Sequence, residues 1–285
     1  AVPIRLGRGG KLPKDERLEG WFRAGGATLR VAAVEEGPSE VVFVVAGEAL
    51  DDLRRLRDDV LSGGRENLMM DFDAPAKDRV FGADRVLPGT IPDLPDEARY
   101  RFVETIPRVV RSPVEVASRF RSSVDYSAST HRFFSALSSV LIGQRPGEPQ
   151  VAEAVAIAGL SAAEKSRRRA VVLLLGRGAE ESGTISAERA RRCLSKLGVP
   201  LHVWDVSWAP AKRKWKSAPR PEGLANARSH WPDAVRVHDS QSLLGAFRAL
   251  AKDLESQRIV WLRGRLNPAK VELTASAGKG ISLVP

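Results

Sequence analysis

Two turns that follow long apolar runs hold the residues best placed for ligand chemistry. The runs, residues 41–45 and 170–175, are continuously apolar, which is typical of strands buried on both faces of a parallel sheet. In such folds, ligands bind where strand ends meet helix starts. The candidate residues in these two turns are Ala46, Gly47, Glu48, Gly176 and Arg177.

The second turn, Gly176-Arg177-Gly178, matches no nucleotide-binding motif. It has the first two glycines of the dinucleotide-binding motif G-x-G-x-x-G but not the third, and it has no Lys-Ser/Thr pair as in a phosphate-binding loop. We interpret it as a turn in which Arg177 is available to an anion. Because an arginine can hold a carboxylate through two parallel hydrogen bonds, Arg177 is a candidate for gripping an acidic group on a partner.

A basic segment between two predicted strands is the second candidate binding feature. It consists of Lys212, Arg213, Lys214, Trp215 and Lys216. Cations next to an aromatic ring can hold phosphates while a base stacks, which is a nucleic-acid signal. The alternative is a solvated loop whose tryptophans fold back onto the domain. Between possible partners, the segment favours a protein or an anionic polymer over nucleic acid.

The remaining reactive side chains predict no catalytic site, metal site or cofactor. The four histidines are scattered, without the spacing of a helical zinc site, and His202 is expected to be packed within a strand. Cys193 is the only cysteine, so neither an intrachain disulfide nor a thiolate zinc site can form. No Gly-x-Ser-x-Gly elbow follows a strand. An enzyme of unknown class on an α/β scaffold stays open as an alternative.

Charge is the main compositional signal. The 285 residues carry a net charge of +10 and a pI near 10.1, which favours an acidic partner or reflects an arginine-rich surface. No apolar run approaches the roughly 18 residues of a membrane span, so no transmembrane segment is expected.

The elements that position the two turns are predicted from periodicity. After residues 41–45, Ala49, Leu53 and Leu56 share one helix face, and the charged residues between them, Asp52 included, are expected to be exposed. Ser186 is predicted to cap a helix that Gly198 ends. Residues 201–206 then form a third central strand, so the crossover is right-handed and the sheet is parallel at its centre.

Two further caps are expected later in the pattern. Ser240 is predicted to cap a helix whose inward face is Leu243, Phe247, Leu250 and Leu254. Ser161 is predicted to cap one of the one or two helical turns within residues 147–168. The fold class is therefore α/β, a doubly wound and mostly parallel sheet flanked by helices. Three regions are expected: an N-terminal β unit (1–38), the α/β domain (39–256), and C-terminal strands (257–285) that pack with the N-terminal unit.

The order of these elements resembles a known family. The resemblance rests on residues 18–22 leading to 41–45, on 169–175 leading to Trp204, and on 243–257 with the strands that follow. In order and spacing these stretches resemble the von Willebrand factor A (VWA) domain, specifically a bacterial subgroup found in Acidobacteria. The resemblance covers roughly residues 18–284 and implies a VWA-like α/β fold.

The family's functional motif is a metal-ion-dependent adhesion site with an Asp-x-Ser-x-Ser sequence, a threonine and a later aspartate. Magnesium prefers such hard oxygen ligands and leaves a position for an acidic group of the partner. The matching positions here hold Ala46, Glu48, Leu50 and Gly176, and only Thr130 is retained. The resemblance therefore implies a degenerate site in which no divalent cation binds.

These observations favour a non-enzymatic, metal-independent interaction or assembly module that binds another protein or further copies of itself. Binding of an anionic polymer or, less favoured, nucleic acid through the basic segment is an alternative, as is the enzyme named above. Because the family is commonly exported and the numbering starts at Ala1, an extracytoplasmic location is expected, with the cytoplasm as the alternative.

The missing ligands at Ala46, Leu50 and Gly176 predict that Mg²⁺, Mn²⁺ and Ca²⁺ do not stabilise the protein. A cation present at a hundred times its dissociation constant would add about 2.7 kcal/mol to the free energy of unfolding. Thermal melting with each cation and with EDTA measures this directly. A rise in melting temperature that EDTA reverses would contradict the prediction.

Overall fold

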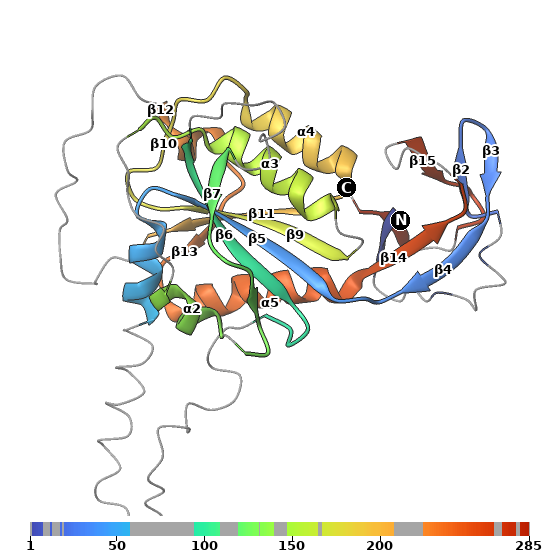
Figure 1. Ribbon diagram of the computed structural model, residues 1–285, viewed down its shortest axis with the longest axis horizontal. Coiled ribbons are helices and arrows are strands. Elements are labelled where there is room, and N and C mark those ends of the chain that lie inside the picture. Colours follow the sequence, from blue (N-terminus) through green and yellow to red (C-terminus); the bar gives the residue numbers. More distant parts are fainter. Residues whose placement is uncertain are drawn as a thin grey trace, which may run out of the picture.

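The computed structural model describes residues 2–7, 12, 18, 20–57, 94–108, 119–130, 132–139, 147–164, 167–207, 225–264, 270–277 and 280–284. The centre of this described part is a sheet of seven strands (Figure 1). In spatial order its strands are β13 (Val235–Val237), β11 (Leu201–Val206), β9 (Arg168–Leu175), β5 (Ser39–Ala46), β6 (Arg99–Pro107) and β7 (Phe120–Ser122), with β8 (Tyr126–Ser127) also paired to β6.

The pairing in this sheet is mostly parallel. Strand β5 lies parallel to β6 on one side and to β9 on the other, and the parallel order continues through β11 to β13. Only β7 and β8 run antiparallel, both against β6. Every residue of β5 and β9 is buried, as expected for strands covered on both faces. The predicted parallel centre is therefore confirmed.

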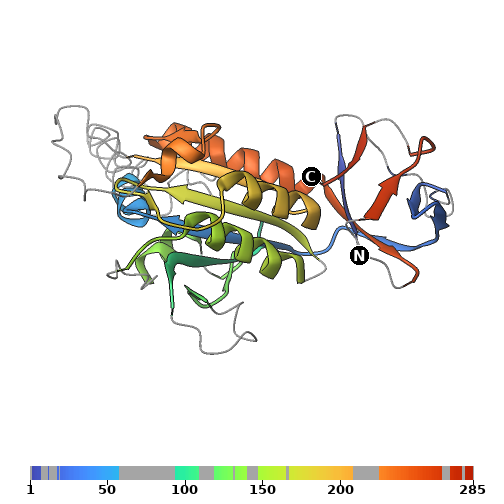
Figure 2. The same cartoon turned by 90° about the horizontal axis from the view of Figure 1, so that it is seen from above.

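Helices cover both faces of the sheet (Figure 2). One face carries Phe43 and packs against a helix described over residues 49–57, α2 (Phe133–Ser139) and α5 (Ser240–Ser256). The other face carries Val42 and Val44 and packs against α3 (Val151–Glu164) and α4 (Ala187–Leu197). The alternation of side chains along one strand thus supplies both hydrophobic layers.

Of the three helix caps predicted from the sequence, one is confirmed and two are wrong. Ser186 caps α4, and Gly198 ends it with a φ of 62°. By contrast, α5 is capped by Asp239 and not Ser240, because the Asp239 carboxylate accepts a hydrogen bond from the Ser242 amide at 2.7 Å. Bonds from the hydroxyl and amide of Ser242 hold the pKa of Asp239 below its usual value.

The cap expected at Ser161 is also wrong, because this residue lies inside α3, a single helix of 14 residues. That helix starts ten residues earlier, at Val151. Its first amides, those of Val151 and Ala152, donate to the carboxylate of Glu181 at 3.2 and 3.0 Å. Glu181 belongs to the short strand β10 (Glu180–Glu181), which pairs with β12 (Ala225–Asn226), followed by the 3₁₀ turn η5 (Ala227–His230). Local sequence does not reveal a cap supplied from about thirty residues away.

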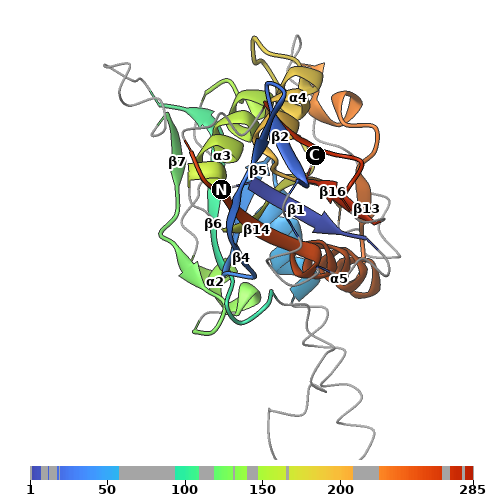
Figure 3. The ribbon, with the colours of Figure 1, turned by 90° about the vertical axis from the view of Figure 1, so that its right-hand side faces the viewer.

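Strands from the two ends of the chain form two further sheets at the end of the central sheet opposite residues 49–57 (Figures 2 and 3). In the first, β1 (Val2–Leu6) lies between β16 (Ile281–Leu283) and β14 (Gln257–Leu262), and β14 also pairs with β4 (Val31–Glu35). In the second, β2 (Phe22–Ala24) lies between β15 (Val271–Leu273) and β3 (Ala27–Leu29). Their shared core includes Ile4, Leu18 and Phe22.

A buried glutamine ties the terminal strands to the central sheet. The Gln257 side chain accepts a hydrogen bond from the Arg169 amide at 2.9 Å and donates one to the Arg169 carbonyl at 3.0 Å. Because Gln257 opens β14 and Arg169 lies at the start of β9, this pair joins the two sheets. No helix in the described part of the chain is long and apolar enough to cross a membrane.

Phe43 is the most sensitive core position that this fold predicts. Its ring lies 5.0 Å from the ring of Phe133 and 5.3 Å from that of Phe102, between centroids. We expect Phe43→Ala to lower the free energy of unfolding by about 3–5 kcal/mol in urea denaturation, because a cavity replaces these contacts. Val124→Ala, at a side chain 71% exposed, is the control and should change it by less than about 0.5 kcal/mol. Equal effects of the two substitutions would contradict the assigned core.

Candidate functional site

The strand-end crevice, formed by the turns after β5 and β9, holds five of the candidate residues. The Gly176 amide donates to the Ala46 carbonyl at 2.9 Å, and the Glu48 amide donates to the Arg177 carbonyl at 2.9 Å. These two bonds continue the β5–β9 ladder past the strand ends. Ala46, Gly47, Glu48, Gly176 and Arg177 are therefore neighbours, as parallel strands with a common edge require.

The two turns touch through their backbones. A Cβ atom on Gly176 would lie 2.1 Å from the Ala49 nitrogen, and one on Gly47 would lie 2.4 Å from the Arg177 carbonyl oxygen. Gly47 also has a φ of 62°, which side chains rarely adopt. Glycine is thus needed at both positions because the crevice is filled by main chain.

Thr130 does not belong to this group. It follows β8, where Ser127 pairs with Arg99, and its amide donates to the Ser127 carbonyl at 3.1 Å. Arg99 is the first residue of β6 and pairs with Glu40 on β5, six residues before Ala46. Six residues of strand span about 20 Å, so Thr130 is held near the end of the sheet where β5 begins and not at the crevice.

A charged cluster occupies the rim of the crevice in place of the residues that the motif would supply. The Arg177 Nε lies 3.1 Å from both carboxylate oxygens of Asp52, and its Nη2 lies 2.9 Å from Asp52 Oδ1. The same Nη2 lies 2.8 Å from Glu48 Oε2. Arg55 adds a weaker contact to Asp52, at 3.3 Å. We call Arg177, Asp52 and Glu48 the arginine clamp.

Burial differs sharply within the arginine clamp. The Asp52 side chain is fully buried, that of Arg177 is 21% exposed, and that of Glu48 is 41% exposed. The hydrogen bonds to Asp52 raise the pKa of Arg177, so the guanidinium stays charged at all relevant pH values. The clamp therefore neutralises a buried carboxylate and joins the β9 turn to the first helix, while Glu48 forms its solvent-facing side.

Asp52 is the residue that sequence reasoning missed, since it was expected on the exposed helix face. Position 52 borders the stripe of Ala49, Leu53 and Leu56, so a small rotation of the helix decides whether it is buried. Its partner Arg177 is 125 residues away in sequence. A local periodicity holds no information about that contact.

The other candidates are placed elsewhere. Lys212, Arg213, Lys214, Trp215 and Lys216 lie outside the described residues. His202 lies in β11 with its side chain 20% exposed, and its Nε2 is 3.2 Å from Asp253 Oδ2. Cys193 is part of α4. Across the residues with described positions, no three His, Cys, Asp or Glu side chains are grouped so that they could hold a metal ion.

Comparison with known proteins adds no family assignment. The chain matches no protein-family model and no curated protein. Among solved structures it is similar to proximal thread matrix protein 1 from the mussel byssus, with a TM-score of 0.40 and 11% identity over 85% of this chain and 50% of that one. It is also similar to the pilus adhesin SpaC from Lactobacillus rhamnosus GG, open conformation, with a TM-score of 0.40 and 10% identity over 78% of this chain and 30% of that one. Likenesses at this level support no conclusion about function.

The arginine clamp predicts an asymmetric pattern of mutational effects. Arg177→Met should lower the free energy of unfolding by about 3 kcal/mol, because it leaves the buried Asp52 carboxylate with only the Arg55 contact. The double variant Arg177→Met/Asp52→Leu should lose less than Arg177→Met alone, since no buried charge remains. Urea denaturation measures both.

Arg192→Gln is the matched control for these variants. Arg192 contacts Glu188 at 3.4 Å in a pair whose side chains are 64% and 76% exposed, so its loss should change stability by less than about 1 kcal/mol. A double variant less stable than Arg177→Met would show that the clamp is not the source of the effect.

Proposed function

We propose that this chain is a non-enzymatic protein-interaction or assembly module, built on a VWA-like α/β fold, that works without a divalent cation. One observation carries the proposal: the arginine clamp places a permanent cation at the crevice, where an intact site of the resembled family would hold a metal ion. A guanidinium that is always charged can balance buried carboxylate charge as a metal ion would, and it does not dissociate.

Two features support a metal-free mode of action. The contact between Gly176 and the Ala49 backbone fills the crevice with main chain. Of the carboxylates near it, Asp52 is already held by Arg177 and Arg55, and the exposed Asp51 and Glu48 are each paired with an arginine, Arg54 and Arg177. The binding energy of a partner would then come from the rim surface itself and not from coordination of a shared cation.

The arginine clamp also refines the role proposed for Arg177. A partner carboxylate would compete for donors that already bind Asp52 and Glu48. Asp52 is buried and bidentate, so it would not be displaced. The Glu48 side chain is 41% exposed, whereas that of Asp52 is fully buried, so an acidic group of a partner would take the place of Glu48. In this proposal Glu48 competes with the partner for Arg177.

An anionic-polymer function through Lys212–Lys216 stays a separate prediction, since that segment lies outside the described residues. The net charge of +10 is compatible with both functions, because each takes an acidic partner. The salt dependence of binding distinguishes the two functions, because the affinity for a polyanion falls steeply as the salt concentration increases.

The experiment is an affinity capture with the immobilised chain, in magnesium and in EDTA, with the captured proteins identified and their affinities then measured on purified material. We expect the same partners and the same affinity under both conditions. We also expect Glu48→Gln to strengthen binding of an acidic partner by about two- to tenfold, because it removes the competing carboxylate.

Two results would count against this proposal. Loss of the partners in EDTA would show that a cation is needed, and a weaker complex with Glu48→Gln would show that Glu48 itself makes the contact. Glu188→Gln, at an exposed glutamate on α4, is the matched control for the lost negative charge and should leave the affinity unchanged.

A further inference from the structure

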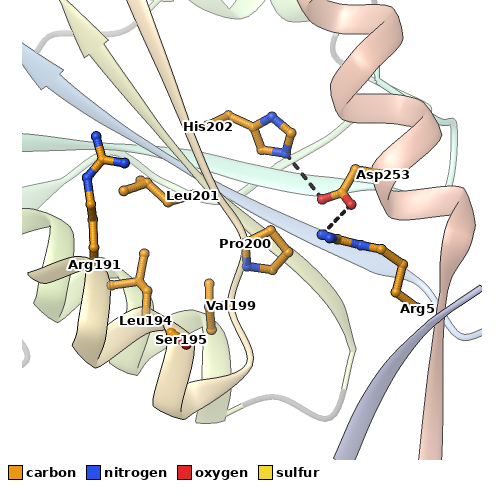
Figure 4. A pocket seen from close by; sticks show the side chains of 9 residues that line it. All are labelled: Arg5, Arg191, Leu194, Ser195, Val199, Pro200, Leu201, His202 and Asp253. Carbon is orange, nitrogen blue, oxygen red and sulfur yellow. Dashed lines mark hydrogen bonds and ion pairs between the residues drawn. The ribbon is translucent and has the colours of Figure 1, made fainter. Parts of the chain in front are cut away.

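A second site lies at the opposite end of the central sheet from the crevice. A cavity of about 410 Å³ opens where β11 begins, between the end of α4, the end of α5 and strand β1 (Figure 4). This volume is within the range of small-molecule pockets in proteins. Because the terminal strand β1 forms one wall, the cavity exists only where the terminal sheet meets the α/β layers.

The lining of this cavity combines an apolar floor with charged walls. The floor consists of Leu194, Val199, Pro200 and Leu201. Arg191 stands on one side, and Arg5, His202 and Asp253 stand on the other (Figure 4). A few polar groups around an apolar surface are what a pocket needs to orient a ligand with an apolar body.

The charges of the walls do not cancel. Asp253 is the single carboxylate of the lining, and it is already bound by Arg5 Nη2 at 2.6 Å and by His202 Nε2 at 3.2 Å. The oxygen that His202 contacts, Asp253 Oδ2, also lies 3.5 Å from the side-chain nitrogen of Gln257, Nε2. With two arginines and one aspartate, the lining itself carries one positive charge when His202 is neutral, and Asp233, which contacts Arg191 from outside the lining, is 79% exposed and screened by solvent.

Both arginines keep a buried donor without a partner. Within the described part of the chain, Arg5 Nε and Arg191 Nη2 are buried and make no hydrogen bond. Arg191 uses its other terminal nitrogen for Asp233, at 3.3 Å, and its guanidinium stacks 5.0 Å from the centroid of the Trp231 ring. These two atoms have almost no accessible surface, so a ligand in the cavity would meet the other nitrogens of the two guanidinium groups. The side chains of Arg5 and Arg191 are only 30% and 35% exposed, so their charges are less screened than that of a fully solvated arginine and attract an anion more strongly.

We propose that this cavity binds a carboxylate carried on a small apolar group, with Arg191 and Arg5 as the residues that recognise the charge. The single positive charge matches a monoanion better than a phosphate dianion. The apolar floor gives the body of the ligand a surface to cover, which a bare inorganic anion would leave empty. This site is independent of the crevice, so its failure would leave the proposed function untouched.

Such a carboxylate has two sources, a free short-chain acid or the C-terminal residue of a peptide. Hexanoate represents the first and N-acetyl-leucine the second, and N-acetyl-leucinamide is a neutral match for the latter. Titration of the ¹⁵N-labelled full chain with each compound, followed by NMR, gives affinity and location together. We expect N-acetyl-leucine to shift the backbone amide signals of residues 194–199, 201 and 202, and N-acetyl-leucinamide to bind at least about tenfold more weakly.

Variants identify the recognising residues. Arg191→Gln and Arg5→Gln should each lower the affinity for N-acetyl-leucine by about tenfold. Arg192→Gln, at the next position of the same helix but paired outside the cavity with Glu188, should leave the affinity unchanged. If a variant fails to fold, the comparison of acid and amide on the unmodified chain still decides the question.

The outcomes are distinct. Stronger binding of hexanoate than of N-acetyl-leucine would assign the site to free acids, and the reverse order would assign it to peptide ends. Either order supports the site. Absence of shifts at residues 194–202 at millimolar ligand, equal binding of acid and amide, or an equal loss with Arg192→Gln would overturn it.

Discussion

The pairing of β5 with β9 is the constraint on which the rest of the structure depends. Eight consecutive residue pairs join the two strands, and every residue of both is buried. Strands without an exposed face need helices on both sides, which is why two hydrophobic layers form around them. Their parallel direction also places both following turns at one edge, so the crevice is a direct consequence of this pairing.

Close approach of those turns then decides what the crevice can hold. With glycine at positions 47 and 176, the main chains of the turns contact each other, and the Arg177 side chain extends along the rim to Asp52. A carboxylate as buried as Asp52 must have a cationic partner, because its charge is otherwise desolvated without compensation. Of the two, Asp52 depends more on the contact, because it is fully buried and its other cationic contact, to Arg55, is longer at 3.3 Å.

Sequence predicted the parts of the fold that depend on local pattern. The two apolar runs predicted β5 and β9, because strands buried on both faces leave a local signal. Residues 201–206 were predicted as the next strand, β11, and Ser186 with Gly198 marked the ends of α4. It was wrong for Asp52 and for the cap of α3, whose partners are distant in sequence. Five crevice residues could be grouped from strand ends, whereas Thr130, chosen by resemblance, lies at the other end of the sheet.

The two ends of the sheet solve the same electrostatic problem in opposite ways. At the carboxyl ends, Arg177 meets two carboxylates of the chain, and one of them is fully buried, so the cluster is satisfied internally. At the amino end of β11, Arg5 and Arg191 share a cavity whose single carboxylate is already bound. Satisfied charges rigidify a structure, whereas partly buried arginines beside a cavity attract an anionic ligand. The arginine-rich composition therefore has two distinct consequences. At the crevice, Arg177 takes the place of a metal cation, and in the cavity at the other end of the sheet, Arg5 and Arg191 can bind an anion.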